Sequence, residues 1–242
     1  MAMTEVIPGF ALSYSEQARF TSETGVRLLR RAAQTIYASE KYQHRGEFGE
    51  LLLHMVLTEF FGTQPAISKL FFKDSANDTV KGFDSVHVAD VNGDLELWLG
   101  EVKFYEDLDS AIRDVIAELE KHAAHDYLRS EFLAIANKID PAWPHADALR
   151  RMLDEDTSLD AIFRRLRVPV LLTYDSKAVQ SHTSYDDPYR ERFVDEVTKG
   201  HAKFSNRERP ADLTVNLILV PLQQKRELVR RLDERLRAWQ RI

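Results

Sequence analysis

The residues whose types and spacing could do chemistry are Asp84, Glu101 and Lys103. The dipeptide Asn92-Gly93 lies between them, flanked by alternating apolar residues, and predicts a two-residue hairpin loop. That loop fixes the register of the two strands, so that Asp84 lies directly opposite Glu101. Because side chains alternate along a strand, Lys103 lies on the same face as both acids.

Two carboxylates on one face of a sheet need a compensating cation. Like charges directly opposite each other in an antiparallel pair cost roughly 0.2–1 kcal/mol, and more beside an apolar face. Because Mg²⁺ prefers carboxylate, carbonyl and water oxygens, we expect Asp84 and Glu101 to hold Mg²⁺ or Mn²⁺, with the Val102 carbonyl as a further ligand. Lys103 would lie beside a metal-bound water, where it can orient that water and offset charge on a phosphate. The predicted chemistry is hydrolysis of a phosphodiester.

An ordinary solvated strand end is the alternative interpretation of Glu101-Val102-Lys103. Triplets of an acid, any residue and a lysine are common in a sequence with 30% charged residues. The context favours a site, because the triplet ends an apolar run over residues 95–99. The expected pairing of Glu101 with Asp84 also follows from the Asn92-Gly93 turn and does not depend on the triplet itself.

The elements around these residues follow from hydrophobic spacing. Apolar residues at helical spacing predict helices on both sides of three strands that are rich in Val, Leu and aromatic residues. Two further strands alternate with helices, so we expect an α/β fold with one shared core and no linker. The predicted helices cover about residues 15–38, 45–61, 107–124, 127–138, 147–166, 189–203 and 223–239, and the predicted strands cover 66–72, 83–91, 95–105, 168–174 and 213–221.

The composition excludes several classes of protein. The 242 residues contain no cysteine, which rules out disulfides, thiolate metal sites and cysteine nucleophiles and indicates a cytoplasmic location. The apolar runs, such as Val215–Leu222, are far shorter than the roughly 20 residues of a membrane-spanning helix, so we expect no membrane association. The sequence also lacks the motifs of serine hydrolases, P-loop ATPases and zincin proteases.

The combined motifs resemble those of the PD-(D/E)xK nuclease superfamily, which has the restriction-endonuclease-like fold. Gly82-Phe83-Asp84 on one strand precedes Glu101-Val102-Lys103 on the next, after a helix that bears glutamates. No proline precedes Asp84, a departure that is common in the superfamily. More narrowly, the pattern over residues 45–105 in a chain of this length resembles the nuclease subunit of the Hachiman anti-phage defence system.

The resemblance implies a core of αβββαβ type with additional flanking helices. It implies one nuclease domain over residues 1–242, with a helical extension at about 1–44 and the core at about 45–242. It also implies DNA cleavage that depends on a divalent metal ion and is controlled by a helicase partner. By position, Asp84 and Glu101 would be metal ligands and Lys103 the catalytic lysine. Either Glu47 or Glu50 of the preceding helix would complete the site, since the two share a helix face.

Two other functions stay open from the residues alone. The chain could be a non-catalytic subunit that keeps the fold and binds a motor protein or nucleic acid, although a scaffold has no need of two opposed acids. It could also be an RNase. His122 and His125 could share a helix face as metal ligands, but we expect a solvated pair at the end of a charged helix.

The net charge of -6 argues at first against an enzyme that acts on nucleic acid. Counting Lys and Arg against Asp and Glu gives net charges of +1 for residues 1–44, -5 for 45–105, -8 for 106–163 and +6 for 164–242. The basic stretch, with Arg164, Arg165, Arg167 and residues 225–241, could face phosphates, or its helix could pair with its own acids. We therefore expect weak DNA binding by the chain alone and delivery of the DNA by a partner.

Overall fold

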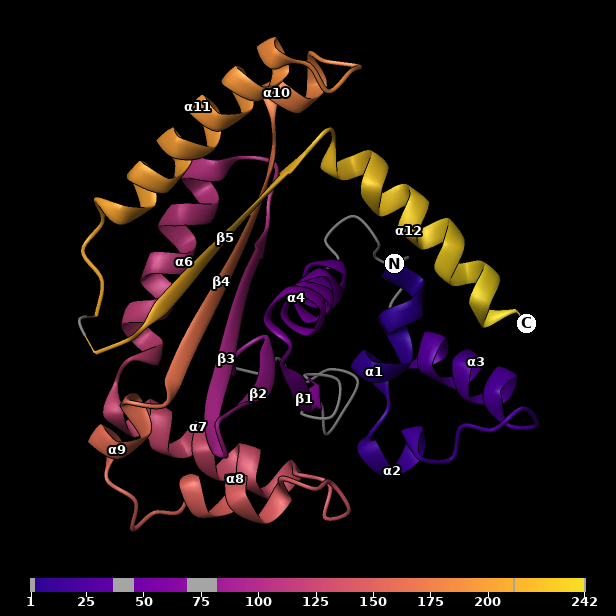
Figure 1. Cartoon of the computed structure of the whole chain (residues 1–242), viewed down its shortest axis with the longest axis vertical. Coiled ribbons are helices and arrows are strands. Elements are labelled where there is room, and N and C mark those ends of the chain that lie inside the picture. Colours follow the sequence, from indigo (N-terminus) through magenta and orange to yellow (C-terminus); the bar gives the residue numbers. More distant parts are fainter. Residues whose placement is uncertain (1–2, 37–45, 69–81, 211, 242) are drawn as a thin grey trace.

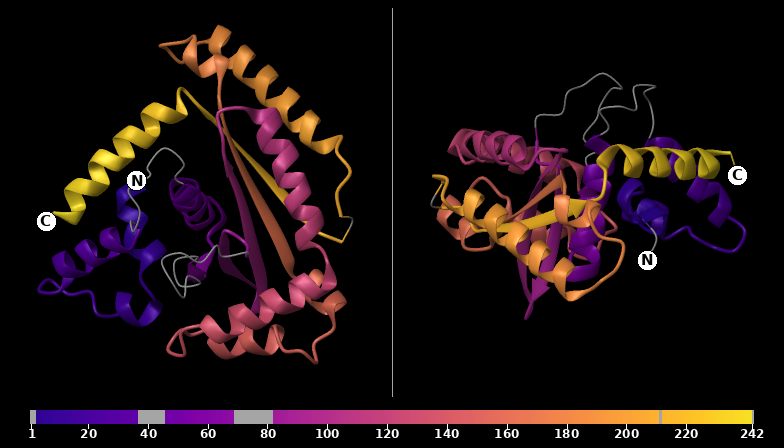
Figure 2. Two further views of the ribbon diagram at one scale, coloured as in Figure 1. Left: turned by 180° about the vertical axis from the view of Figure 1, so that it is seen from behind. Right: turned by 90° about the horizontal axis from the view of Figure 1, so that it is seen from above.

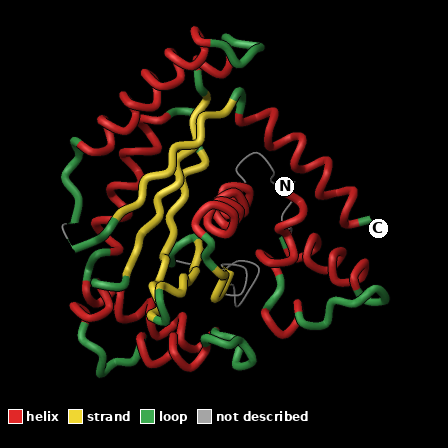
Figure 3. Tube along the Cα trace, in the orientation of Figure 1, coloured by secondary structure: helices red, strands yellow, loops and turns green. Residues whose placement is uncertain are grey.

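The computed structural model describes residues 3–36, 46–68, 82–210 and 212–241. These residues form a mixed α/β fold around a five-stranded sheet with strand order β1-β2-β3-β4-β5 (Figures 1 and 3). The predicted α/β fold is therefore confirmed. The strands are β1 (Gln64–Ser68), β2 (Ser85–Val91), β3 (Asp94–Phe104), β4 (Leu166–Asp175) and β5 (Val215–Leu222).

The sheet combines an antiparallel part and a parallel part. β1, β2 and β3 pair antiparallel, whereas β4 lies parallel to β3 and β5 lies parallel to β4. The helix α4 (Gly46–Phe61) precedes β1, and α6 (Leu108–His122) opens the connection from β3 to β4. The chain thus follows the expected αβββαβ order, with α7, α8 and α9 inserted between α6 and β4.

The hairpin between β2 and β3 has the predicted loop. Asn92 and Gly93 have φ angles of 56° and 88°, in the left-handed region that a type I′ turn requires at both positions. The turn sets the register along the rest of the hairpin. The predicted pairs are present for Val91 with Asp94, Val88 with Leu97, and Val86 with Leu99.

Successive side chains of β3 point to opposite faces of the sheet, and different helices cover the two faces. Gly100 and Val102 face α4, which approaches so closely that a Cβ at Gly100 would lie 2.7 Å from Cδ2 of Leu53. Glu101 and Lys103 point to the other face, where their side chains meet residues of α6. The views in Figures 1 and 2 place α4 and α6 on opposite sides of the sheet.

Some predicted boundaries differ from the structure. The single helix expected over 147–166 is two helices, because Ser158 caps α9 and Asp154 accepts a hydrogen bond from the N–H of Asp156 in the turn before it. The helix expected over 15–38 is likewise divided into α2 and α3. The predicted ends at residues 38 and 72 and the predicted start at residue 45 lie outside the described residues.

The remaining helices surround the sheet and its ends (Figure 1). None of the helices in the described part of the chain is long and apolar enough to cross a membrane. Their bounds are η1 (Met3–Val6), α1 (Ile7–Ala11), α2 (Tyr14–Gln17), α3 (Gly25–Thr35), α7 (His125–Lys138), α8 (Ala146–Met152), α9 (Leu159–Phe163), α10 (Lys177–Gln180), α11 (Asp187–Ser205) and α12 (Lys225–Gln240).

The N-terminal helices pack against α4 and α12. Phe10 of α1, Leu28 of α3, Phe48 of α4 and Leu232 of α12 belong to one buried apolar cluster. Burial of such side chains contributes about 1.5–3 kcal/mol each relative to exposure. The expected N-terminal extension therefore shares apolar contacts with the first helix of the core and with the last helix of the chain.

Replacing Gly49 by alanine should destabilise the fold, because a Cβ there would lie 2.8 Å from Cβ of Phe104 and 3.0 Å from Cγ2 of Val102. This overpacking should lower the free energy of unfolding by about 1–3 kcal/mol. Gly46→Ala is the control at the start of the same helix, where a Cβ would meet nothing within 4 Å. Urea denaturation measures the free energy of unfolding of both variants. Equal stability of the two would contradict the close approach of α4 to β3.

Candidate active site

Asp84 is held against β3 by two hydrogen bonds. Its backbone N–H donates to the Gly100 carbonyl over 2.8 Å, and its carboxylate Oδ2 accepts from the backbone N–H of Val102 over 2.9 Å. The regular ladder between β2 and β3 ends at Ser85 and Gly100, so Asp84 does not form the expected ladder pair with Glu101. Its carboxylate instead accepts the hydrogen bond from the N–H of Val102. The negative charge of Asp84 then lies close enough to Glu101 to raise the pKa of Glu101.

The carboxylate of Glu101 is buried without full compensation. Only 1% of the residue is exposed. Its Oε1 lies 2.7 Å from Nδ1 of His122, but neither atom makes a hydrogen bond of acceptable geometry within the described ranges. Burial, and then the negative charges of Asp84 and Glu118, raise the pKa of Glu101 well above its ordinary value. A cation beside Oε1 would offset this unfavourable environment.

Lys103 is buried beside these acids and forms an ion pair with Glu118 through Nζ and Oε2. Burial lowers the pKa of the ammonium, but the hydrogen bond to Glu118 and the surrounding negative charges outweigh burial, and the pKa is raised overall. Burial raises the pKa of Glu118, but the contact with Lys103 outweighs it and lowers that pKa. Both partners are therefore charged at neutral pH.

The helix α6 supplies two members of this cluster, Glu118, which belongs to no motif, and His122. The helix begins at Asp107, whose carboxylate accepts a hydrogen bond from the N–H of Ser110 over 2.8 Å. Glu118 and His122 are four residues apart and share a helix face, so both reach β3. The signal in the sequence is that both border the apolar stripe of the predicted helix. That stripe consists of Ala111, Ile112, Val115 and Leu119.

His122 is buried, so the expectation of a solvated pair is wrong for this residue. Its ring stacks on that of Tyr127, with 4.5 Å between centroids, and lies 4.7 Å from the ring of Phe83. The cause is the turn after α6, which brings α7 and Tyr127 back against the imidazole. Burial lowers the pKa of His122 to about 4, so the ring is neutral at pH 7. His125 is exposed, as expected.

Glu47 and Glu50 lie on α4, the helix that covers the face of β3 opposite to Lys103. Glu50 is buried and Glu47 is half-buried. The face that carries Glu101 and Lys103 is covered by α6, which supplies its own glutamate to the cluster. The role of either α4 glutamate at the metal stays a prediction.

The residues fit a hard divalent cation, as the protein part of a site that is completed by other ligands. No group of three or more His, Cys, Asp or Glu side chains in the described part of the chain is arranged to hold a metal ion. Mg²⁺ commonly uses one or two protein carboxylates and takes its other ligands from water and substrate phosphates. Asp84 and Glu101 match that pattern, because Oε1 of Glu101 is buried and has no hydrogen bond to a described residue. The Val102 carbonyl stays a predicted ligand.

Comparison with known protein families gives a match over nearly the whole chain. The model of the family described as HamA matches residues 2–236, which include Asp84, Glu101, Lys103 and all of α6. A search of curated proteins gave no match.

In the presence of a chelator, Glu101→Gln should change how stability depends on pH. The raised pKa means that the folded state holds the Glu101 proton more tightly than the unfolded chain does. The wild-type protein should therefore lose stability as the pH rises above about 4.3, the ordinary Glu value, and through the folded-state pKa. The variant lacks this proton and should gain stability relative to the wild type over the same range.

Urea denaturation in EDTA from about pH 4 to about pH 8 measures the difference in free energy of unfolding between the two proteins. Glu59→Gln, at an exposed glutamate of α4, is the control and should leave the pH dependence unchanged. A difference between wild type and Glu101→Gln that stays constant with pH would contradict the raised pKa.

Proposed function

This chain belongs to the HamA family of the Hachiman anti-phage defence system, and we propose that it is a metal-dependent nuclease that hydrolyses DNA phosphodiester bonds. The observation that carries the proposal is the buried Oε1 of Glu101, which has no hydrogen bond to a described residue. The fixed carboxylate of Asp84 and the ammonium of Lys103 accompany it. Such a cluster of acidic side chains and one ammonium group has the composition that metal-assisted phosphodiester hydrolysis needs.

In this proposal Asp84 and Glu101 hold Mg²⁺ or Mn²⁺, with the Val102 carbonyl as a further ligand. When bound, the ion supplies Lewis-acid stabilisation of the charge that develops on the phosphate. Lys103 acts as a charged donor, because its raised pKa suits it to orient the attacking water and to offset charge on a phosphate oxygen. Glu118 fixes that ammonium on the face of β3 through the ion pair.

We also infer that a helicase subunit presents the DNA to this chain and controls its cleavage. The support is the resemblance of the motifs to the Hachiman nuclease subunit together with the net charge of -6, which repels a polyanion at long range. Residues 106–163 carry a net charge of -8, and one of their acids, Glu118, forms the ion pair with Lys103 at the candidate site. A chain of this charge needs a partner to bring the strand within contact distance.

A non-catalytic subunit with the same fold is the second candidate. It is favoured by the absence of a preformed three-residue metal cluster among the described residues. Isothermal titration calorimetry separates the two candidates, since the nuclease should bind Mn²⁺ or Mg²⁺ in a way that Asp84→Asn abolishes. Parallel assays on DNA and RNA of one sequence decide between a deoxyribonuclease and an RNase.

Lys103→Ala should abolish DNA cleavage while the protein stays folded. Loss of one charged donor at a developing phosphate charge should lower the rate by about 10²-fold or more. Lys199→Ala is the control, because Lys199 is also paired with an acid, Asp195 at 2.7 Å, but lies on α11. Cleavage of labelled DNA in Mg²⁺ is measured with the partner subunit present, and circular dichroism checks the fold. Cleavage by Lys103→Ala at the wild-type rate would contradict the proposed function.

The chain alone should bind DNA only weakly at physiological salt, with a Kd of roughly 10⁻⁶ to 10⁻⁴ M, because its overall charge is negative. The complex purified from the native host should contain a helicase and should bind and cut DNA better than the chain alone. Fluorescence anisotropy and the cleavage assay measure both. Nanomolar binding by the chain alone would contradict delivery by a partner.

A further inference from the structure

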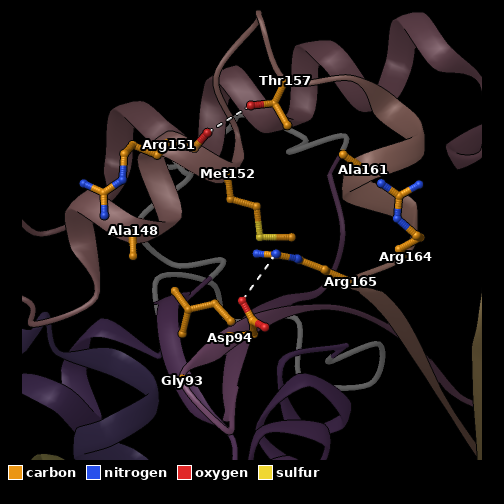
Figure 4. A pocket seen from close by; sticks show the side chains of 10 residues that line it. Gly93, Asp94, Ala148, Arg151, Met152, Thr157, Ala161, Arg164 and Arg165 are labelled. Carbon is orange, nitrogen blue, oxygen red and sulfur yellow. Dashed lines mark hydrogen bonds and ion pairs between the residues drawn. The ribbon is translucent and has the colours of Figure 1, made fainter.

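A cavity of about 420 Å³ lies between the β2–β3 hairpin and the helices α8 and α9 (Figure 4). The buried apolar side chains of Leu95 and Met152 form its floor, and the rest of the lining is mostly polar. Three arginines line it: Arg151 from α8, and Arg164 and Arg165 from the segment that connects α9 to β4. The cavity thus combines an apolar base with cationic side chains from two separate segments.

The three arginines are placed differently around this cavity. Figure 4 shows Arg151 and Arg164 on opposite sides, with Arg165 extended between them toward Asp94. Asp94 is the one acid among the described residues that line the cavity, and its Oδ1 lies 3.3 Å from Arg165 in an exposed ion pair. One carboxylate and three guanidinium groups belong to the residues of the lining, whose formal charge is therefore +2.

The guanidinium groups of Arg151 and Arg164 have no hydrogen bond or ion pair to a described residue, which distinguishes them from those of arginines nearby. Arg150 donates to the Ile139 carbonyl over 2.9 Å, and Arg129 donates to the Thr157 carbonyl over 2.8 Å. Arg167, two positions after Arg165, pairs with Glu96 over 2.6 Å. The guanidinium groups of these neighbouring arginines are therefore paired within the protein, whereas those of Arg151 and Arg164 keep their donors for a ligand.

The basic residues of α12 show the contrary arrangement. Arg230 pairs with Glu227 at 2.7 Å and with Glu234 at 2.5 Å, and Arg237 pairs with Asp233 at 2.9 Å. The expected alternative, a helix whose arginines pair with its own acids, is confirmed for these residues. The unpaired cationic donors of the basic stretch therefore include Arg164, at the cavity.

We propose that this cavity is a second binding site for the substrate strand, which takes one or two phosphate groups on its arginines and a base on its apolar floor. Guanidinium groups bind phosphate oxygens through two parallel hydrogen bonds. The volume is within the range of small-ligand sites. The acids of residues 154–156 precede Thr157 of the lining but do not line the cavity themselves.

The site rests on the proposed function and extends it, because the cavity and the candidate active site lie at two points along β3. Leu95 at the cavity and Glu101 lie on the same face of this strand, six positions apart, which corresponds to about 20 Å at roughly 3.3 Å per residue. That span equals about six base pairs of DNA. A strand shorter than this cannot occupy both places, so the contribution of the cavity should depend on substrate length.

The test is DNA binding by the full chain in EDTA at low salt, which separates binding from cleavage. Arg151→Ala/Arg164→Ala should weaken the affinity for 30-nucleotide DNA about 10-fold and reduce the slope of log K against log salt by about 1–2. Affinity for 5-nucleotide DNA bound at the active site should stay within about twofold. Arg27→Ala/Arg235→Ala removes the same charge at two exposed arginines of α3 and α12 and should have little effect.

Equal losses in the two double variants would overturn the proposal, because the effect would then be one of net charge. Unchanged binding of long DNA by Arg151→Ala/Arg164→Ala would also overturn it. Titration with dAMP distinguishes the source of the phosphate: arginine-dependent binding of dAMP without arginine-dependent binding of long DNA would assign the cavity to a free nucleotide instead. If Lys103→Ala retains arginine-dependent binding, that supports the second site even where the proposed nuclease activity fails.

Discussion

The structure depends on charged side chains that are buried on one face of its central strand. Glu101 and Lys103 in β3 are 1% and 8% exposed, and buried charges are costly unless they are paired. Lys103 is paired with Glu118, and Asp84 accepts from the N–H of Val102, but Oε1 of Glu101 has no hydrogen bond among the described residues. Stability alone would favour apolar residues at these positions. The cost of the cluster therefore argues that it serves a function.

The same constraint decides how the helices are arranged. Because Glu118 and His122 contact β3, α6 has to lie on the face of Glu101 and Lys103, and α4 covers the opposite face. That face is built for close packing: the absence of a side chain at Gly100 lets Leu53 of α4 approach the strand. On the other face, Leu97 and Leu99 pack with α6 in the main apolar core, and the charged cluster begins next to that core, at Glu101.

The hairpin could be predicted from the sequence because the information is local. The dipeptide Asn92-Gly93 determines the turn, and the turn determines which residues pair, without any knowledge of the tertiary fold. The contacts of Glu118 and His122 could not be predicted in this way, since they depend on which part of α6 meets β3. The end of the β2–β3 ladder at Ser85 could not be predicted from the turn either. It depends on the side chain of Asp84, whose carboxylate accepts a hydrogen bond from the N–H of Val102 in β3.

Net charge alone describes this protein poorly, since the location of each charge decides what it does. Glu118 is engaged with Lys103 on the face of β3, and the arginines of α12 are engaged with acids one turn away. These paired charges add little to the field at a distance, because opposite charges close together cancel and salt screens what is left beyond about 10 Å. The unpaired arginines at the cavity act on a phosphate that has come within about 10 Å of them. An acidic protein of this kind selects a strand by position rather than by attraction, so in the proposed function a partner must position the DNA before the buried cluster can act on it.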